Sequence, residues 1–407
     1  MISARLSVID DIFLRTHRGF GIPIVLQGVW RSDDAVDHVE LAAIHSNLSL
    51  GPLGRRVVTP TVPFARRRWA PSTDSLPLEY DTSPLAVSEV LDWADAQGEC
   101  DLDPETGPSW RLSARSTDDG GTVLSLVCSH VVADAAGLIE AAGMALTGSV
   151  PPESYAYPIS DVCDAAALVW RVSKAALLAL AGLLFSRRAR SELRDFVRAS
   201  SGAIPHEMSV STAVFDIDSR LSNSEFISVV TDIMVALGQH EPVAINVPFR
   251  SNIPGANGIG MATVNISRTD SLAEIKDACK RAFTTPVGAP SGFPAEMVQL
   301  LPERASAALT SAPGHAAALC SNIGDLPDAV GVIGSHRAST VATRALHPHS
   351  GSARTTTILS AYLSTLNGTS TLSLVGTDPA LIPSSDTLAE QAHAVLTDRQ
   401  LTARSWR

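Results

Sequence analysis

The sequence predicts an α/β (α+β) protein of two halves, each with a largely β central sheet flanked by helices. Its 407 residues exceed the length at which one hydrophobic core keeps growing, so two domains of about 200 residues are expected. Short apolar runs typical of buried strands alternate with stretches of helical composition. We therefore divide the chain into an N-terminal half at 1–160, a linker with a crossover helix at 161–205, and a C-terminal half at 206–407.

The first 60 residues predict two helices with a strand between them. Residues 21–30 alternate as a strand does, and residues 35–48 have helical composition. The helix expected within residues 1–20 carries one apolar face, made of Leu6, Ile9, Phe13 and Leu14.

A basic segment follows this region. It contains Arg55, Arg56, Arg66, Arg67 and Arg68. The plainer interpretation is a solvated face. The other is a docking surface for an acidic partner that bears phosphopantetheine.

The stretch 122–142 contains the clearest candidate for a catalytic residue in the chain. Residues 123–128 are apolar and rich in valine and leucine, which predicts a buried strand. Asp134 then stands where it can cap the helix that follows. His130 is thus expected at a corner between a strand and a helix, where rigid elements hold the imidazole against a cleft. A histidine there can act as a general base near neutral pH.

The positions Ser129-His130-Val131-Val132-Ala133-Asp134-Ala135 resemble the His-His-x-x-x-Asp-Gly signature of an acyltransferase superfamily. Its members include chloramphenicol acetyltransferase, the plant BAHD acyltransferases and nonribosomal peptide condensation domains. The chain is most similar to two further branches, the polyketide-associated acyltransferases and the wax ester synthase/diacylglycerol acyltransferases. The catalytic second histidine and the aspartate of the signature are kept, whereas Ser129 and Ala135 replace its first histidine and its glycine.

Other landmarks occur in the order that this family has. Residues 102–112 resemble its "Leu-Asp, Gly-Pro, Trp-Arg" entry to the hairpin before the motif, and 319–324 resemble its "Ser-Asn, Gly" strand. Residues 357–374 predict a hairpin that turns at Asn367-Gly368. The resemblance spans nearly the whole chain, and it implies two chloramphenicol acetyltransferase-like halves with the active site in the cleft between them.

The resemblance also implies roles for individual residues. His130 would remove a proton from a hydroxyl or amine acceptor as that acceptor attacks an acyl thioester. Asp134 would point away from the base and pair with Arg250, which ends the strand expected at 243–250. No cofactor is expected, because acyl-CoA or a phosphopantetheine-bound acyl group is itself the substrate. The residues expected at the substrate tunnel are Ser129, Ser321 and Asn322.

The linker predicts a long helix through 165–185. Its uninterrupted apolar run, 175–185, is too short to span a bilayer, since Arg171 and Lys174 precede it. A helix that crosses between the two halves is the favoured interpretation. An interfacial anchor, with nearby arginines at lipid headgroups, is the less favoured one.

The composition of the chain indicates its cellular compartment and excludes one class of partner. The 31 Lys+Arg and 42 Asp+Glu give a net charge of −11, which argues against a nucleic-acid surface. The five cysteines form no C-x-x-C pair and are odd in number, so neither a disulfide framework nor a zinc site is indicated. The first residues carry charges inside any apolar core, unlike a signal peptide. A cytoplasmic protein is expected.

Two alternatives remain for reactive side chains. Cys128 lies two residues before His130 and could act as a nucleophile with a histidine base, although a cysteine in an apolar strand usually serves packing. His347 and His349 could suggest a metal, yet no Cys, Asp or Glu nearby in sequence completes a ligand set. A loop pair without metal is the plainer interpretation.

Two hypotheses for function follow. The first is an acyltransferase that moves an acyl group from a CoA or acyl-carrier-protein thioester to a small hydroxylated or amine acceptor, in lipid or natural-product biosynthesis. The second is a condensation-like protein that catalyses another reaction, such as a cyclisation, or only binds a carrier protein. Ser129 and Ala135 keep the second hypothesis open.

Overall fold

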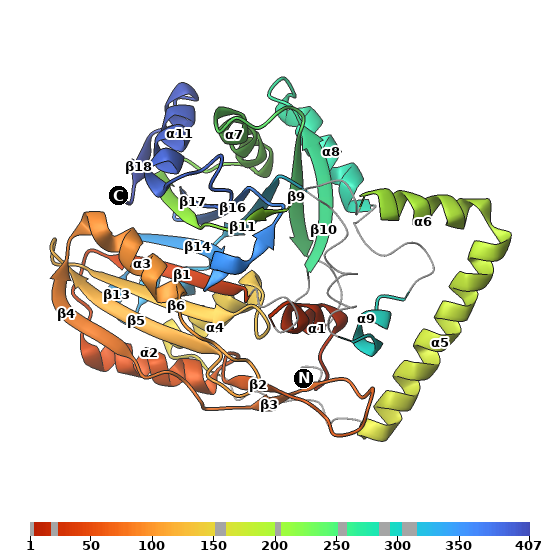
Figure 1. Ribbon diagram of the computed structural model, residues 1–407. Helices are drawn as coiled ribbons and strands as arrows, with labels where there is room; N and C mark the ends of the chain where they lie inside the picture. Colours follow the sequence, from red (N-terminus) through yellow and green to blue (C-terminus); the bar gives the residue numbers. More distant parts are fainter. Residues whose placement is uncertain are drawn as a thin grey trace.

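The structure, a computed structural model, describes residues 4–17, 23–150, 160–199, 205–250, 259–284, 294–302 and 316–407. Two mixed sheets, each flanked by helices, form its body (Figure 1). The predicted fold class is therefore confirmed.

The N-terminal sheet has five strands in the order β14-β1-β6-β5-β4. Neighbouring strands are antiparallel except for β4 and β5, which are parallel. Successive residues of β1 face opposite sides of the sheet, so Leu26 packs in the core beside α4 while Val29, three residues on, packs beside α3. The elements of this half are β1 (Val25–Ser32), α2 (His38–Leu50), β4 (Glu79–Leu85), η2 (Val87–Glu89), α3 (Val90–Gly98), β5 (Trp110–Thr117), β6 (Thr122–Ser129), α4 (Ala135–Thr147) and β14 (Thr340–Leu346).

The C-terminal sheet has seven strands in the order β10-β9-β11-β16-β17-β8-β18. The strand β11 runs parallel to both β9 and β16, and the other pairs are antiparallel. Helices α7, α8 and α11 lie together beside this sheet (Figure 1). Its elements are β8 (Ser211–Ile217), α7 (Asn223–Ala236), β9 (Val243–Arg250), β10 (Ile259–Ile266), α8 (Leu272–Thr284), β11 (Ala318–Asp325), β16 (Leu359–Leu366), β17 (Thr369–Gly376), α11 (Ser385–Asp398) and β18 (Ala403–Ser405).

One strand crosses the division that the sequence suggested. Residues Thr340–Leu346 belong to the C-terminal half by position, yet they form β14 and pair with β1 from Arg31 to Val25. The two halves are thus joined by a shared strand as well as by the linker.

Smaller elements surround the two sheets. The helices are α1 (Val8–Arg15), α5 (Asp161–Phe185), α6 (Arg187–Ala199), α9 (Met297–Leu300), η3 (Asp328–Val330) and η4 (Ser350–Ser352). The short strands pair as β2 (Arg55–Val58) with β3 (Arg68–Pro71), β7 (His206–Glu207) with β15 (Arg354–Thr355), and β12 (Val332–Ile333) with β13 (His336–Arg337).

Local sequence signals set several of these boundaries. Asp134 caps α4 by accepting a hydrogen bond from the Gly137 N–H at 2.8 Å, as its position predicts. Ser222 caps α7 in a capping box with Glu225. The turn between β16 and β17 has positive φ at both central residues, 52° and 89°, which an Asn-Gly pair tolerates.

Three of the five arginines of the basic segment contact other parts of the protein, whereas Arg56 is exposed. Arg55 is only 6% exposed, and its guanidinium lies 4.6 Å from the Trp69 ring centroid. Arg66 pairs with Asp164 at 2.6 Å, and Arg67 pairs with Asp11 at 2.7 Å. The solvated-face interpretation is therefore wrong for these three arginines, whose partners were not visible from the local pattern. The docking of an acidic partner stays a prediction.

Candidate functional site

A cavity of about 300 Å³ lies between the two halves. Most of its wall is apolar, with a few polar groups, which is typical of a small-molecule site. The N-terminal sheet and its helices contribute Phe13, Ile24, Leu26, His130, Ala135, Leu138 and Ile139. The C-terminal sheet contributes Pro248, Ile259, Met261, Leu319, Ser321, Ile323 and Tyr362.

His130 stands at the corner where β6 ends and α4 has not yet begun. Its backbone N–H donates to the carbonyl of Ile24 at 2.9 Å. Arg55 donates to the carbonyl of Val132, two residues further on. The imidazole stacks on the Phe13 ring, with centroids 3.9 Å apart and planes inclined by 12°. Parallel stacking covers a face of the ring and not its nitrogen-bearing edge, so the ring is oriented without losing its acid-base groups.

His347 is a second histidine of the same cavity. The residues before the two histidines, Ser129 and Leu346, both pair with Val25 from opposite sides of β1. His130 and His347 therefore leave the sheet at the same level, on strands about 10 Å apart.

Burial is the main cause that lowers the pKa of His347 from 6.5 to about 4. A hydrogen bond with the backbone of Pro23 opposes the shift, and the nearby His130 contributes a smaller part of the lowering. Its Nδ1 has no hydrogen-bond partner among the described residues. His347 is thus neutral at pH 7. The sequence had suggested only a loop pair with His349, which instead is exposed and lies 2.9 Å from Asp101.

The cavity continues into a wider mouth of about 490 Å³. The two spaces share wall residues of α4, β9, β10 and β11, including Ile139 and Pro248. The mouth carries more charged side chains than the cavity, namely Asp134, Glu140, Arg250 and Asp325. The cavity also has polar groups, among them Gln27, Arg344 and Tyr362. The path from the surface to His130 therefore passes from a charged rim to a mostly apolar interior.

Asp134 and Arg250 reach the same mouth, and the ion pair between them stays a prediction. The Asp134 carboxylate accepts from the Gly137 N–H. Its geometric role is thus to start α4 beside His130. Arg250 is exposed at the end of β9.

The three residues expected at the substrate tunnel lie in different places. Ser321 lines both the cavity and its mouth, whereas Asn322 lines the mouth alone. Ser129 is 2% exposed and lines a separate pocket of about 310 Å³ with Cys100 and Gly107. Successive residues of a strand face opposite sides, so Ser129 and His130 point into different spaces.

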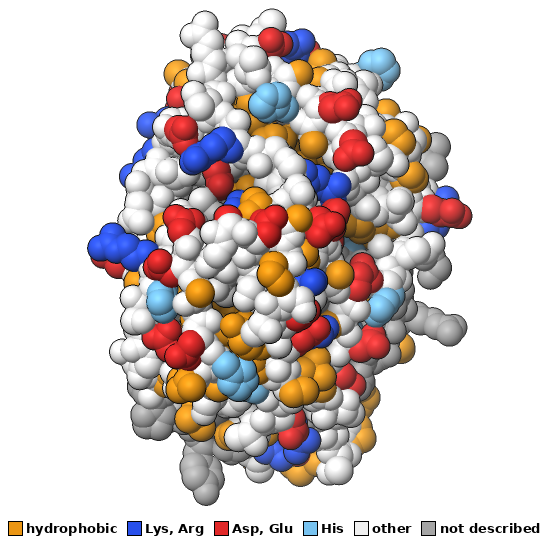
Figure 2. All heavy atoms as spheres, turned by 90° about the vertical axis from the view of Figure 1, so that its left-hand side faces the viewer, with side chains coloured by type: hydrophobic (Ala, Val, Ile, Leu, Met, Phe, Trp, Pro, Cys, Tyr) orange, Lys and Arg blue, Asp and Glu red, His pale blue; other side chains and the backbone are white. Residues whose placement is uncertain are grey.

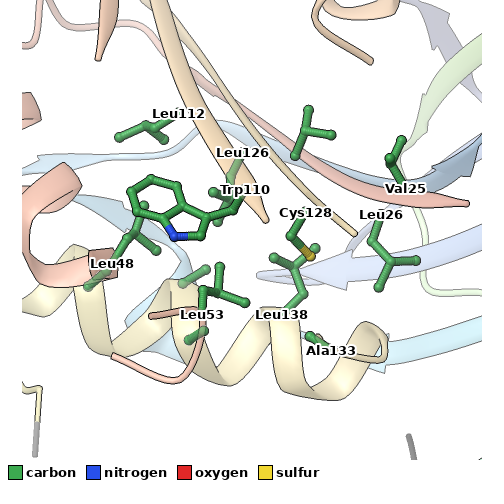
Figure 3. Packing of buried hydrophobic residues seen from close by; sticks show 14 of the residues in the cluster. Val25, Leu26, Leu48, Leu53, Trp110, Leu112, Leu126, Cys128, Ala133 and Leu138 are labelled. Carbon is green, nitrogen blue, oxygen red and sulfur yellow. The ribbon is translucent and has the colours of Figure 1, made fainter. Parts of the chain in front are cut away.

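Cys128 is fully buried and packs among Leu26, Ala133 and Leu138 (Figure 3). Burial raises the pKa of its thiol to about 12, so the thiolate that a nucleophile requires is not formed near neutral pH. The packing interpretation of Cys128 fits this environment. In the described part of the chain, no group of three His, Cys, Asp or Glu side chains could hold a metal ion.

A buried polar network supports the cavity from the side of α3. Gln27 donates to the carbonyl of Ala94 at 2.6 Å and to Ser125 at 2.8 Å, and it accepts from Arg344 at 2.7 Å. Arg344, whose side chain is 1% exposed, also pairs with Asp95 at 2.7 Å. The network fixes β1 and β14, the two strands that lead to Ile24 and His347. Sequence reasoning missed it because its members are spread over 300 residues.

Comparison with known proteins identifies the architecture. No family model matches the chain, and no curated protein matches it by sequence. Solved structures match over nearly its whole length. The starter condensation domain of the rhizomide synthetase RzmA, in complex with C8-CoA and Leu-SNAC, has a TM-score of 0.55 at 10% identity, covering 98% of this chain and 93% of that one.

Two other matches come from different proteins. The wax ester synthase/diacylglycerol acyltransferase of Marinobacter aquaeolei VT8 has a TM-score of 0.52 at 13% identity, with 97% and 98% of the chains covered. SgcC5 of Streptomyces globisporus has a TM-score of 0.50 at 14% identity, with 97% and 99% covered. The chain therefore has the fold of the condensation-domain and chloramphenicol acetyltransferase-like superfamily that its motifs resemble.

Proposed function

We propose that the protein is an acyltransferase that moves an acyl group from a CoA or acyl-carrier-protein thioester to a small hydroxyl or amine acceptor, with His130 as general base. The observation that carries the proposal is the position of His130. Its ring is held by Phe13 in the wall of an apolar cavity that both halves of an acyltransferase-type fold enclose.

In the proposed reaction, His130 removes the proton from the acceptor O–H or N–H while the acceptor oxygen or nitrogen attacks the thioester carbonyl. The new C–O or C–N bond forms, the C–S bond breaks, and the proton passes from His130 to the departing sulfur, which leaves as a free thiol. A positioned base contributes about 10² to 10⁴ in rate, or roughly 3 to 5 kcal/mol. Orientation of both substrates in the cavity supplies a further part of the acceleration.

The cavity suits this pair of substrates in two ways. Its apolar wall, formed by side chains such as Leu138, Ile139 and Met261, suits an acyl chain. Its few polar groups include Tyr362, whose pKa burial raises to about 12, and the neutral His347. Both can hydrogen-bond to an acceptor without adding charge next to His130.

A thioester donor is supported by the similarity to RzmA, whose structure was determined in complex with C8-CoA and Leu-SNAC. We place the reaction in lipid or natural-product biosynthesis in the cytoplasm, as composition and resemblance predict.

The test is release of free thiol. Purified protein is incubated with acyl-CoA of increasing chain length, and with acyl-phosphopantetheine on a carrier protein, in the presence of alcohol and amine acceptors. We expect thiol release that depends on an acceptor and yields an ester or amide by mass spectrometry. A folded protein that binds an acyl-carrier protein and releases no thiol with any donor would favour the condensation-like alternative instead.

A further inference from the structure

Helix α5 (Asp161–Phe185) is apolar on two opposite faces. Its buried side includes Ala165, Leu168, Val172 and Ala179. Most helices at the surface of a globular protein carry a single apolar stripe, and a helix that is apolar all round belongs in a core or in a lipid environment. Large exposed side chains cover the other side of α5, namely Val162, Val169, Trp170, Leu177, Leu178, Leu180, Leu184 and Phe185.

Among the described residues, ion pairs connect α5 to the body of the protein only in the first half of the helix. Asp161 pairs with Arg5 and Asp164 with Arg66, each at 2.6 Å. Further along, Arg171 reaches Glu296 beside α9 at 3.4 Å. Beyond this point the helix extends along the outside of the molecule and meets α6 (Figure 1). It does not run between the two sheets.

The exposed apolar side chains continue to the end of α5. Leu184 is 73% exposed and Phe185 is 87% exposed. Within the described residues α5 is the one helix long and apolar enough to cross a membrane, with 25 residues, a mean hydropathy of 1.7 and 17% of its most apolar window buried. The helix is continuous through Arg171 and Lys174. Its 25 residues are long enough to cross a membrane, although the apolar run 175–185 alone is not.

Helix α6 (Arg187–Ala199) adds positive charge directly after this apolar surface. Arg187, Arg188, Arg190 and Arg194 are all exposed, and Glu192 is paired with Arg188. The two acidic residues of α5 are already paired with arginines of the body. The end of α5 and the start of α6 are therefore locally basic on a chain whose net charge is −11.

The corner between the two helices is also fixed. Arg190 donates to the carbonyls of Leu183 and Leu184 at 2.8 and 2.9 Å, and so caps the end of α5. The apolar side chains and the arginines are thereby held next to each other as one surface.

We infer that this surface, formed by α5 and α6 and called the arm below, docks on an anionic lipid bilayer. The apolar face of α5 would enter the boundary between headgroups and acyl chains, and the arginines of α6 would contact lipid phosphates. The inference does not depend on the proposed function, because it uses no residue of the cavity.

The arm lies on the bilayer and does not span it. Its first residues are tied to Arg5 and Arg66 of the N-terminal half, and the chain continues after α6 into β7 and β8 of the C-terminal half. A spanning α5 would need the arginine-rich α6 to cross back through the hydrocarbon, which is costly.

A lipid partner also fits better than a protein partner. Protein interfaces combine apolar side chains with a polar rim and about one hydrogen bond per 100–200 Å². The exposed side of α5 is rich in leucine and offers few hydrogen-bonding groups. By contrast, the face of the molecule turned away from the arm mixes acidic, basic and small apolar patches (Figure 2).

The test uses the full chain with extruded vesicles of phosphatidylcholine alone or with 30% phosphatidylglycerol, analysed by co-sedimentation. Two paired variants are compared, Leu177→Glu with Leu184→Glu in the arm, and Val39→Glu with Leu50→Glu on α2. All four side chains are exposed, so both variants should fold, which circular dichroism and thermal unfolding verify.

We expect wild type to bind the anionic vesicles at least tenfold more tightly than the neutral ones, with weaker binding at 0.5 M salt. The arm variant should lose at least tenfold in affinity, while the α2 variant binds as wild type does. Trp170 fluorescence, taken as the difference from Trp170→Phe, should shift to the blue on binding. Absence of vesicle binding by wild type overturns the inference. The inference is also overturned if wild type self-associates in sedimentation velocity, and the arm variant abolishes this self-association but binds vesicles as wild type does.

Discussion

The lowered pKa of His347 should make the stability of the folded protein depend on pH, and replacing His347 by glutamine should remove this contribution. In the folded protein the pKa of His347 is about 4, against 6.5 for an ordinary histidine. A lowered folded pKa means that the unfolded chain binds the proton more readily. Stability from this group is therefore fully present above pH 6.5 and is lost as the pH falls toward 4. Glutamine does not titrate, and its amide N–H can still donate to the carbonyl of Pro23.

The size of the effect follows from the two pKa values. A difference of 2.5 pKa units, from 6.5 to about 4, corresponds to about 3 kcal/mol once the group is fully titrated. Between pH 7.5 and pH 5.0 the wild type should lose about 2 kcal/mol of its free energy of unfolding through His347 alone.

The assay is guanidinium chloride unfolding, followed by tryptophan fluorescence at half-unit steps over this pH range. His349→Gln is the matched control, because His349 is exposed and the same substitution there leaves His347 in place. Identical pH dependence in wild type and His347→Gln would refute the reasoning that the folded protein holds His347 as a neutral ring.

Three further predictions concern the surroundings of the site. Phe13→Leu should remove the ring that orients His130 and reduce kcat/KM for thioester turnover by about tenfold to a hundredfold; unchanged kinetics would mean that the stack has no positioning role. Asp95→Asn should leave the buried Arg344 charge without its partner and lower the free energy of unfolding by about 3 to 5 kcal/mol, whereas a loss below about 1 kcal/mol would show that water compensates the charge. Ala135→Gly should destabilise by about 0.5 to 1 kcal/mol and leave turnover nearly unchanged, because Ala135 is already the first residue of α4; a large gain in turnover would show that the glycine of the family signature matters for chemistry.

The features that sequence predicted well are those with local causes. The cap at Asp134 and the Asn367-Gly368 turn each depend on a few neighbouring residues. His130 at the end of β6 followed from the same kind of signal, an apolar run that stops before a capped helix. The family resemblance supplied the two-sheet architecture that local signals cannot give.

The features that sequence missed depend on pairings between distant segments. His347 reaches the cavity because β14 pairs with β1. No local pattern predicts that a strand of the C-terminal half pairs with the N-terminal sheet. The placement of Ser129 away from the cavity could have been predicted, since it precedes His130 on a strand and must face the other way.

The most direct test of the central claim is the rate of acceptor-dependent thiol release by His130→Ala. His349→Ala serves as the control, because that histidine lies outside the cavity. Equal circular dichroism spectra and unfolding midpoints establish that both variants are folded. If His130 is the general base, thiol release by His130→Ala falls by at least about a hundredfold, while His349→Ala retains the rate of the wild type. A folded His130→Ala protein that releases thiol at the rate of the wild type contradicts the assignment of His130 as the catalytic base.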